Sequence, residues 1–263
     1  MRKMMRPLGL LLIAAFAITS CKKEAKVADE KISGEVLTQI KNLGFSTANV
    51  QKVEEGYLVE GDIILTPDRL NERPSSPRLR IAEVEQYHTF NLVSVSGTRN
   101  ITISTSGNVN TNVSNAINAA IARYNAENLQ ITFSRVSSNG NINIRIVNGG
   151  GYIASAGFPS GGNPYPEVKF NRQYQNYSSG FVTTVIAHEV GHCIGFRHTD
   201  YMNRSYSCGS GGNEGQETTG VGAVHIPGTP TGPDSASWML ACLSSTTNRP
   251  FNSNDKTALN YLY

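Results

Sequence analysis

Three of the five histidines in this 263-residue chain lie within eleven residues of one another, at positions 188, 192 and 198. A helix places residues four apart on the same face, so His188 and His192 can both reach one metal ion. Gly195 can adopt the left-handed conformation that ends a helix, which turns the chain back and brings His198 to the same point. Imidazole nitrogens are common ligands of zinc. The spacing therefore predicts one zinc ion held by His188, His192 and His198.

Glu189 directly follows the first of these histidines. Three protein nitrogens leave one tetrahedral position of zinc open to water, which distinguishes a catalytic zinc site from a closed structural one. The carboxylate of Glu189 is too close to His188 along the chain to share the metal, but it can reach the zinc-bound water. It would take the proton of this water and return it to a leaving amine. The chemistry predicted is hydrolysis of an amide bond, with Glu189 as the catalytic base.

The alternative is that the histidines are packed or exposed on an amphipathic helix and bind no metal. The pattern HExxHxxGxxH would then have arisen by accident, which is improbable for so many fixed offsets. His88 and His225 are expected to be structural or exposed, because the metal already has three ligands. Asp200 has two roles open to it: it orients His198 as a hydrogen-bond acceptor, or it caps a turn.

Zinc is the only cofactor that the sequence supports. The loop at residues 207–215 could offer calcium the side chains of Asn213 and Glu214. A calcium site needs six to eight oxygen ligands, and the loop has no such pattern, so calcium is possible but unsupported.

The elements that must position these residues follow an α+β pattern from about residue 86. In residues 141–147, isoleucines alternate with polar residues, as in a half-buried strand. In residues 113–124, apolar side chains share one face of an amphipathic helix. The complete set of elements predicted here comprises strands at residues 100–105, 130–136, 141–147 and 167–171 and helices at residues 113–124, 179–195 and 255–261.

A small N-terminal region precedes this pattern. Residues 33–43 have the apolar spacing of a helix and residues 57–65 the composition of a strand, a unit too small to be stable alone. Residues 71–80 contain two prolines and three arginines, which indicates an exposed linker open to proteolytic nicking. The domains predicted are a signal peptide (1–20), a tether (21–31), an N-terminal pro- or accessory region with its linker (32–80) and a catalytic domain (81–263).

The first residues predict export. Arg2, Lys3 and Arg6 precede an apolar stretch at residues 8–18 that is too short to span a bilayer, as in a signal peptide. The following Ile-Thr-Ser-Cys resembles the lipobox of bacterial lipoproteins, which implies that Cys21 is acylated and anchors the chain to a membrane. The alternative is an ordinary cleaved signal with a coincidental cysteine. The expected location is the bacterial cell envelope, as an outer-membrane lipoprotein facing the periplasm or the surface.

Apart from Cys21, the chain has three cysteines, at positions 193, 208 and 242. Because this number is odd, one thiol stays free or pairs outside the chain. Cys208 and Cys242 lie in Gly/Ser-rich, loop-like sequence and are the expected disulfide. Cys193 is expected to be buried on a helix as a small hydrophobe.

The segment HEVGHCIGFRHTD (residues 188–200) resembles the extended zinc signature of the metzincin metallopeptidases and, more narrowly, the bacterial dual-action HEIGH metallopeptidases. The resemblance is specific over residues 179–200 and looser over residues 86–178 and 237–263. It implies an α+β fold: a twisted mixed sheet with a backing helix and an active-site helix, above an irregular lower subdomain with a Met-turn and a C-terminal helix.

The metzincin resemblance also implies an apolar floor beneath the metal, formed by a methionine turn. Met239 in Ser237-Trp238-Met239 is the plausible match. Some members have a tyrosine two residues later, where this chain has Ala241. We therefore expect no tyrosine at the metal, and the oxyanion would be stabilised mainly by zinc.

The activity that the resemblance implies is zinc-dependent endopeptidase action on proteins outside the inner membrane. The substrate would bind in extended form along residues 152–158 or 167–171. If residues 32–70 inhibit the enzyme, a carboxylate such as Asp62 could cap the metal. Two alternatives remain: a catalytically silent lipoprotein that uses this scaffold to bind another protein, and a purely structural zinc. The intact Glu189 argues against the first and the open zinc position against the second.

Composition excludes other function classes. A net charge of +3, with several positive residues at the extreme N-terminus, leaves no basic surface for nucleic acid. The hydrophobic content of 39% is sufficient for a globular core, which excludes a fully disordered chain. We expect a monomer.

Overall fold

The computed structural model describes residues 31–71, 86–210, 222–230 and 232–263. The predicted signal peptide, the predicted lipidation site Cys21 and nearly all of the predicted linker lie outside these residues. The helices are α1 (Gly34–Asn42), α2 (Pro67–Leu70), α3 (Thr111–Asn125), α4 (Ser179–Cys193), α5 (Ser205–Cys208) and α6 (Ser253–Leu262), with a 3₁₀ turn at Arg172–Tyr174. The strands are β1 (Gln51–Val53), β2 (Gly56–Val59), β3 (Ile63–Leu65), β4 (Tyr87–His88), β5 (Arg99–Ser106), β6 (Ile131–Arg135), β7 (Ile142–Val147), β8 (Ala154–Ser155), β9 (Glu167–Asn171) and β10 (Val224–His225).

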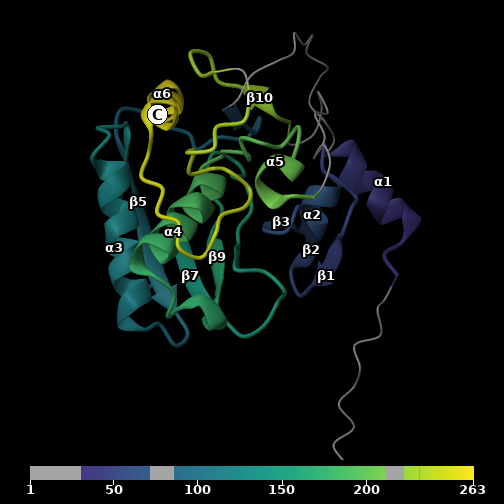
Figure 1. The fold of residues 1–263 in the computed structure, drawn as a ribbon, viewed down its shortest axis with the longest axis horizontal. Coiled ribbons are helices and arrows are strands. Elements are labelled where there is room, and N and C mark those ends of the chain that lie inside the picture. The colour runs from purple at the N-terminus through teal and green to yellow at the C-terminus, as the bar shows by residue number, and fades with distance from the viewer. Residues whose placement is uncertain (1–30, 72–85, 211–221, 231) are drawn as a thin grey trace, which may run out of the picture. The chain divides into compact units, whose positions relative to one another are not determined.

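A five-stranded mixed sheet is the centre of this α/β fold (Figure 1). Its strand order is β6-β5-β7-β9-β8, and only β8 runs antiparallel to its neighbour. β7 alternates buried and half-buried residues, which confirms the strand predicted from the isoleucine spacing. β9 lies between β7 and β8, so β8 is an edge of the sheet.

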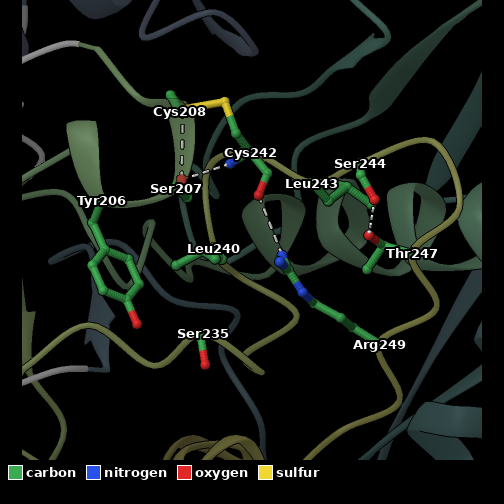
Figure 2. Close-up of a pocket in the computed structure, with 10 residues that line it drawn as sticks. All are labelled: Tyr206, Ser207, Cys208, Ser235, Leu240, Cys242, Leu243, Ser244, Thr247 and Arg249. Atoms are coloured by element: carbon green, nitrogen blue, oxygen red, sulfur yellow. Dashed lines mark hydrogen bonds between the residues drawn. A yellow bond between two sulfur atoms is a disulfide. The ribbon is translucent and has the colours of Figure 1, made fainter.

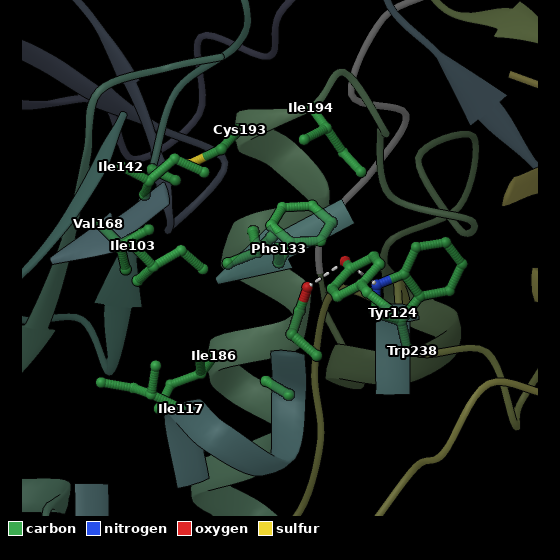
Figure 3. Close-up of a cluster of buried hydrophobic side chains, with 14 of the residues drawn as sticks. Ile103, Ile117, Tyr124, Phe133, Ile142, Val168, Ile186, Cys193, Ile194 and Trp238 are labelled. Atoms are coloured by element: carbon green, nitrogen blue, oxygen red, sulfur yellow. Dashed lines mark hydrogen bonds between the residues drawn. The ribbon is translucent and has the colours of Figure 1, made fainter. Parts of the chain in front are cut away.

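Helices α3 and α4 pack side by side against this sheet. Each helix begins at a side chain that accepts a hydrogen bond from the first turn, Asn110 for α3 and Ser178 for α4. α4 is buried from Phe181 to Cys193, so its apolar residues are spread around the helix and not confined to one face. In the core shown in Figure 3, the Tyr124 hydroxyl donates to the carbonyl of Ala187 at 2.7 Å, which ties α3 to α4 one residue before His188.

The N-terminal region differs from the single strand predicted for residues 57–65. β2 and β3 form an antiparallel hairpin with a turn at residues 60–62. Glu60 (φ 55°) and Gly61 (φ 92°) adopt left-handed backbone conformations, which reverse the chain. The described residues from Ile32 to Tyr263 form one compact unit. The prediction of one continuous strand was wrong because the reversal depends on the conformation of Glu60, which composition does not indicate.

The C-terminal helix also begins earlier than predicted. Asn252 caps α6, and Asp255 accepts a hydrogen bond from the backbone of Asn252 in return. In the part of the chain that is described, no helix has the length and apolar character needed to cross a membrane.

Candidate metal centre

Helix α4 carries His188, Glu189 and His192, and its last turn determines where the third histidine lies. The amide of Gly195 donates to the carbonyl of His192, and the amide of Phe196 donates to that of Gly191, both at 2.9 Å. This pair of bonds is the Schellman arrangement, which needs a residue with positive φ after the helix.

Gly195 supplies that conformation, with φ 112°. A Cβ at this position would lie 2.7 Å from Leu92 Cδ2 and 2.9 Å from the carbonyl oxygen of Asn91. Only glycine fits, because both the conformation and the space exclude a side chain. The turn directs the chain back so that His198 faces α4.

The three histidine rings meet at their Nε2 atoms. His192 Nε2 lies 3.1 Å from His188 Nε2 and 3.2 Å from His198 Nε2. Two nitrogens bound to one tetrahedral zinc ion at about 2.0 Å are about 3.3 Å apart. The spacing of the rings therefore fits a single ion bound by all three nitrogens.

Hydrogen bonds to carbonyl groups fix the orientation of two of these rings. His188 Nδ1 lies 2.8 Å from the carbonyl oxygen of Trp238, and His192 Nδ1 lies 2.8 Å from that of Phe196. A carbonyl oxygen can only accept, so each Nδ1 carries the proton and each Nε2 presents a lone pair. Lone pairs that converge at such short distances repel one another unless a cation lies between them.

Electrostatics keep His192 neutral, as a metal ligand must be. Burial, followed by repulsion from His188 and His198, holds the pKa of His192 well below its ordinary value. The ring is fully buried. The site is therefore ready to accept a cation without first losing a proton from this ring.

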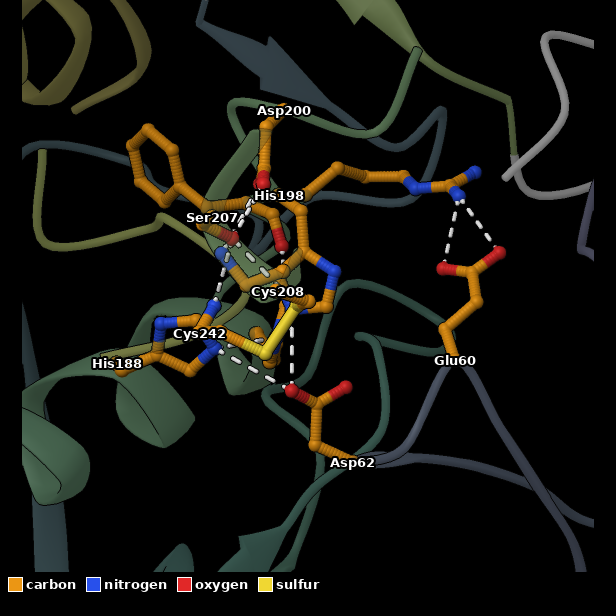
Figure 4. A network of polar contacts seen from close by, with 12 residues as sticks. Glu60, Asp62, His188, His198, Asp200, Ser207, Cys208 and Cys242 are labelled. Carbon is orange, nitrogen blue, oxygen red and sulfur yellow. Dashed lines mark hydrogen bonds and ion pairs between the residues drawn. A yellow bond between two sulfur atoms is a disulfide. The ribbon is translucent and has the colours of Figure 1, made fainter. Parts of the chain in front are cut away.

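A carboxylate from the N-terminal hairpin completes the group. Asp62 Oδ2 lies 3.1 Å from His198 Nε2 and 3.7 Å from His188 Nε2 (Figure 4). Ligand atoms of Asp62, His188, His192 and His198 all lie within 4.8 Å of one another. Burial alone would raise the pKa of Asp62, but electrostatic attraction to the histidines, first of all His198, outweighs it and holds that pKa well below the ordinary value.

Glu189 lies beside this group without a partner of its own. The side chain is 3% exposed, and its Oε2 makes no hydrogen bond within the described residues. Burial, and after it the Asp62 charge, raise the pKa of Glu189 well above its ordinary value. A buried carboxylate without a partner is costly, and a cation among the histidines would stabilise its charged form. The donor set and this unpaired oxygen both fit a bound zinc ion.

Trp238 and Met239 are fully buried and pack against helix α4 next to the histidines. The amide of Thr199 donates to the carbonyl of Met239 at 3.0 Å, which joins the segment after His198 to this turn. The carboxylate of Asp255 accepts from the Trp238 amide at 3.3 Å. Met239, the residue predicted to form the Met-turn, therefore packs against helix α4.

One cavity adjoins the centre, and a second cavity adjoins the first. The first, of about 210 Å³, is lined by His188 and Glu189 together with Asp62, Tyr152 and Ala154 among others. The second, of about 650 Å³, is shown in Figure 2 and shares Cys242 and Leu243 with the first. A disulfide between Cys208 and Cys242 forms part of its wall. Cys193 is a buried free thiol on α4.

Asp200, His88 and His225 are not among the converging ligands. The carboxylate of Asp200 accepts from the Ser207 hydroxyl at 2.5 Å and from the Ala241 amide at 3.0 Å, which supports its role in shaping the loop. His88 and His225 lie on the paired strands β4 and β10, apart from the group of converging ligands. Asn213 and Glu214, considered above as calcium ligands without support, lie outside the described residues.

One buried ion pair at the site was not predicted. Arg197 Nη2 lies 3.3 and 3.2 Å from the two carboxylate oxygens of Glu60, and neither side chain is exposed (Figure 4). Arg197 occupies a variable position of the zinc signature, next to His198. No sequence signal links it to a glutamate 137 positions earlier.

Three histidine nitrogens around one point, with a buried carboxylate beside them, define the site of a metallopeptidase. The chain belongs to the dual-action HEIGH metallo-peptidase family, whose model matches residues 57–263. It is therefore a metalloprotease, and the family implies a zinc cofactor. The matched residues include the turn that carries Glu60 and Asp62.

Comparison with solved structures finds similarity to myroilysin. One myroilysin structure matches with 15% sequence identity and a TM-score of 0.45, and the match covers 66% of this chain and 96% of that chain. A second matches with 15% identity and a TM-score of 0.39, covering 60% and 80%. A search of the curated proteins finds no match.

Proposed function

We propose that the chain is a zinc endopeptidase of the metzincin type, in which His188, His192 and His198 hold one zinc ion and Glu189 is the catalytic base. The observation that carries the proposal is the convergence of three Nε2 atoms beside a buried, unpaired carboxylate. The unpaired carboxylate of Glu189 argues against the structural-zinc alternative, because a closed structural site has no need of such a group beside it.

The groups at the centre would have different roles in the reaction. A bound zinc ion supplies Lewis acidity, which polarises a scissile carbonyl and lowers the pKa of water. Glu189 takes a proton from the attacking water and delivers it to the leaving nitrogen. The carbonyls of Trp238 and Phe196 hold the histidine rings in the orientation that binding requires.

The substrate would bind in extended form along the edge strand β8. Only an edge strand has free hydrogen-bonding groups for an added chain, and β9 is enclosed between β7 and β8. This topology supports residues 152–158, and not 167–171, as the stretch that receives substrate. The cavity lined by Tyr152, Ala154 and Glu189 lies along it.

We further propose that the protein is a lipoprotein of the bacterial cell envelope, anchored by acylated Cys21 and monomeric. The signal-like sequence at residues 1–20 supports export. The disulfide between Cys208 and Cys242 is consistent with an oxidising compartment.

The experiment that tests the peptidase is hydrolysis of an unfolded protein, with and without a zinc chelator. It uses the mature chain and the same chain carrying Asp62→Asn, so that this carboxylate does not compete at the metal. Glu189→Gln should abolish hydrolysis while zinc stays bound at one equivalent. Glu35→Gln, an exposed position on α1, is the matched control and should have no effect. One equivalent of zinc without any hydrolysis would favour the silent binding scaffold instead.

A further inference from the structure

The second cavity lies next to the cavity that His188 and Glu189 line. The two cavities share Cys242 and Leu243 in their walls. The second has a volume of about 650 Å³, within the size range of cavities that bind ligands in proteins. A polypeptide whose scissile bond lies at the metal centre can therefore place a neighbouring side chain in this second cavity.

Arg249 is the one charged residue among the described residues that line the second cavity. The other lining residues are hydroxyl-bearing residues, two leucines and the disulfide-bonded cysteines. Figure 2 shows the guanidinium end of Arg249 directed inward, toward Cys242 and Leu240. The described wall of the cavity therefore carries a positive charge and no negative one.

The guanidinium group of Arg249 has hydrogen-bond donors to spare. Its Nη1 donates to the carbonyl oxygen of Cys242 at 3.4 Å, which is long for a hydrogen bond. Within the described residues, the side chain makes no other hydrogen bond and no ion pair. Burial lowers the pKa of Arg249, and attraction to nearby aspartates, first of all Asp200, does not offset it. A carboxylate bound in the cavity would supply the missing partner, because its two oxygens match the planar fork of a guanidinium.

The three aspartates nearest in electrostatic influence are already bonded to other groups. Each carboxylate accepts hydrogen bonds from at least two donors, none of them on Arg249. The charge of Arg249 is therefore available to a ligand. The donors are Ser207 and Ala241 for Asp200, Ala236, Asn252 and Asn254 for Asp234, and Gln86, Trp238 and Asn252 for Asp255.

The backbone of Arg249 is attached to the helix that carries the metal ligands. Its amide donates to Thr184 Oγ1 at 2.9 Å, and Thr184 lies one turn before His188 on α4. Its carbonyl accepts from Arg123 Nη1 on α3, also at 2.9 Å. These bonds to two packed helices fix the starting point of the side chain relative to the metal centre.

Another part of the cavity wall is attached to the segment that follows His198. The amide of Cys242 donates to the Ser207 hydroxyl at 3.0 Å, and this hydroxyl donates to the carboxylate of Asp200, two residues after His198. The disulfide joins Cys242 to Cys208. A side chain in the cavity would therefore have a defined position relative to the metal centre.

We propose that the second cavity receives an acidic side chain of the substrate, with Arg249 as the residue that binds its carboxylate. The inference rests on the peptidase function proposed above, and it names the substrate class: polypeptides with glutamate or aspartate close to the bond that is cut. The methylene groups of the bound side chain would pack against Leu240 and Leu243. Arg249 selects the substrate and takes no part in proton transfer.

The experiment measures equilibrium binding and does not depend on turnover. It uses the mature zinc-loaded chain with Glu189→Gln and Asp62→Asn, which cannot hydrolyse a peptide and keeps the Asp62 carboxylate off the metal. Short peptides of alanine and leucine, with blocked ends and a neutral fluorophore, differ only in a central glutamate, glutamine or lysine. Fluorescence anisotropy gives the Kd of each peptide.

The glutamate peptide should bind about tenfold more tightly than the glutamine peptide, as expected of a charge-assisted pair in a half-buried site. The lysine peptide should bind most weakly, and added salt should reduce the preference for glutamate. Arg249→Gln should remove this preference, Arg249→Lys should keep part of it, and Arg249→Glu should change it into a preference for lysine. An arginine with only a structural role would affect all three peptides alike.

Arg135→Gln is the matched control. Arg135 is also a half-buried arginine, and it lies on β6, at the opposite edge of the sheet from β8. This variant should keep the full preference for glutamate. Near-ultraviolet circular dichroism verifies that each variant is folded.

The inference is overturned if the glutamate and glutamine peptides bind equally, if the preference survives in Arg249→Gln and Arg249→Glu, or if no peptide binds. Hydrolysis of the same peptides by the chain with Glu189 intact tests the peptidase separately. Hydrolysis without a preference that depends on Arg249 rejects only the acidic-side-chain site. Selective binding without any hydrolysis rejects only the peptidase. Cleavage at a fixed distance from the glutamate supports both.

Discussion

The sulfur of Met239 lies against the backbone of Gly191, so close that a Cβ on this glycine would be 2.5 Å from Sδ. Gly191 is in the zinc helix, directly before His192. The same imagined Cβ would lie 3.1 Å from Trp238 Nε1. The glycine therefore lets Met239 and Trp238 approach helix α4 closely, beside His188 and His192.

Gly191→Ala should therefore destabilise the fold and weaken the metal site. Although alanine favours helices, its methyl group would force Met239 away, and overpacking of this kind typically costs about 1–3 kcal/mol. The shift would also displace the neighbouring His192. Urea unfolding should show the loss of stability, and titration with a zinc-binding dye should show weaker zinc affinity.

Gly34→Ala is the matched control, because this glycine lies in helix α1 and a Cβ there would meet nothing within 4 Å. It should leave zinc affinity unchanged. If Gly191→Ala binds zinc as tightly as wild type and is equally stable, then the close approach of Met239 has no energetic role.

The convergence of the three histidines could be predicted because it depends on local spacing. His188 and His192 share a face of one helix, and Gly195 turns the chain within six residues to present His198. The alternation in β7 and the capping of α3 and α4 are local signals of the same kind. These features can be predicted from sequence because they depend on interactions between residues that are close along the chain.

The contacts of the N-terminal hairpin could not be derived in the same way. Asp62 and His198 are 136 positions apart, and sequence alone could offer the aspartate only as one candidate carboxylate. Its position depends on the left-handed turn at Glu60, which is held by the distant Arg197. Long-range pairing of this kind leaves no periodic signal, because it depends on tertiary packing.

Zinc should stabilise the folded protein through the histidine group. A ligand that binds only the folded state stabilises it by about 4 kcal/mol at a free concentration near 1000 times its Kd. For a domain of this size, that corresponds to an increase in Tm of about 8–16 °C. Differential scanning fluorimetry of the chain with chelator and with zinc measures the shift.

His192→Ala should lose most of this shift, because His192 Nε2 faces both other nitrogens. His225→Ala is the control: it removes a histidine outside the ligand group, so the zinc-induced shift should remain. If zinc raises the Tm of His192→Ala as much as that of wild type, zinc binds elsewhere in the protein.

The disulfide should stabilise the loop that walls the second cavity. Cys208 and Cys242 are 34 positions apart, and closing a loop of this length stabilises the fold by up to about 4 kcal/mol by restricting the unfolded chain. The double substitution to serine should lower the free energy of unfolding by a comparable or smaller amount.

Chemical denaturation with and without a reducing agent measures the effect. The reducing agent should destabilise wild type and leave the double variant unchanged. A thiol-reactive dye should label no cysteine in the native oxidised chain beyond the anchor position, because Cys193 is buried. Equal sensitivity of both proteins to reduction would show that another bond is responsible.

Asp255 should make stability depend on pH in an identifiable direction. Its buried carboxylate accepts hydrogen bonds from Gln86 Nε2 at 2.7 Å and from the Asn252 amide at 3.0 Å. Burial nevertheless raises the pKa of Asp255 from 3.8 to about 7. Since the folded state binds the proton more tightly than the unfolded state, this group stabilises the fold fully below about pH 4, and the contribution is lost as pH rises through about 7.

Asp255→Asn removes this dependence, because the amide does not ionise. The free energy of unfolding of the variant, relative to wild type, should therefore rise by about 4 kcal/mol between pH 4 and pH 8, on top of a constant cost for the altered hydrogen bonds. Ser253→Ala, an exposed position in the same helix, should differ from wild type by an amount independent of pH. Urea unfolding of the three proteins across this range gives the result. A difference between Asp255→Asn and wild type that is flat, or that falls with rising pH, would show that Asp255 is ionised throughout and that its hydrogen bonds outweigh its burial.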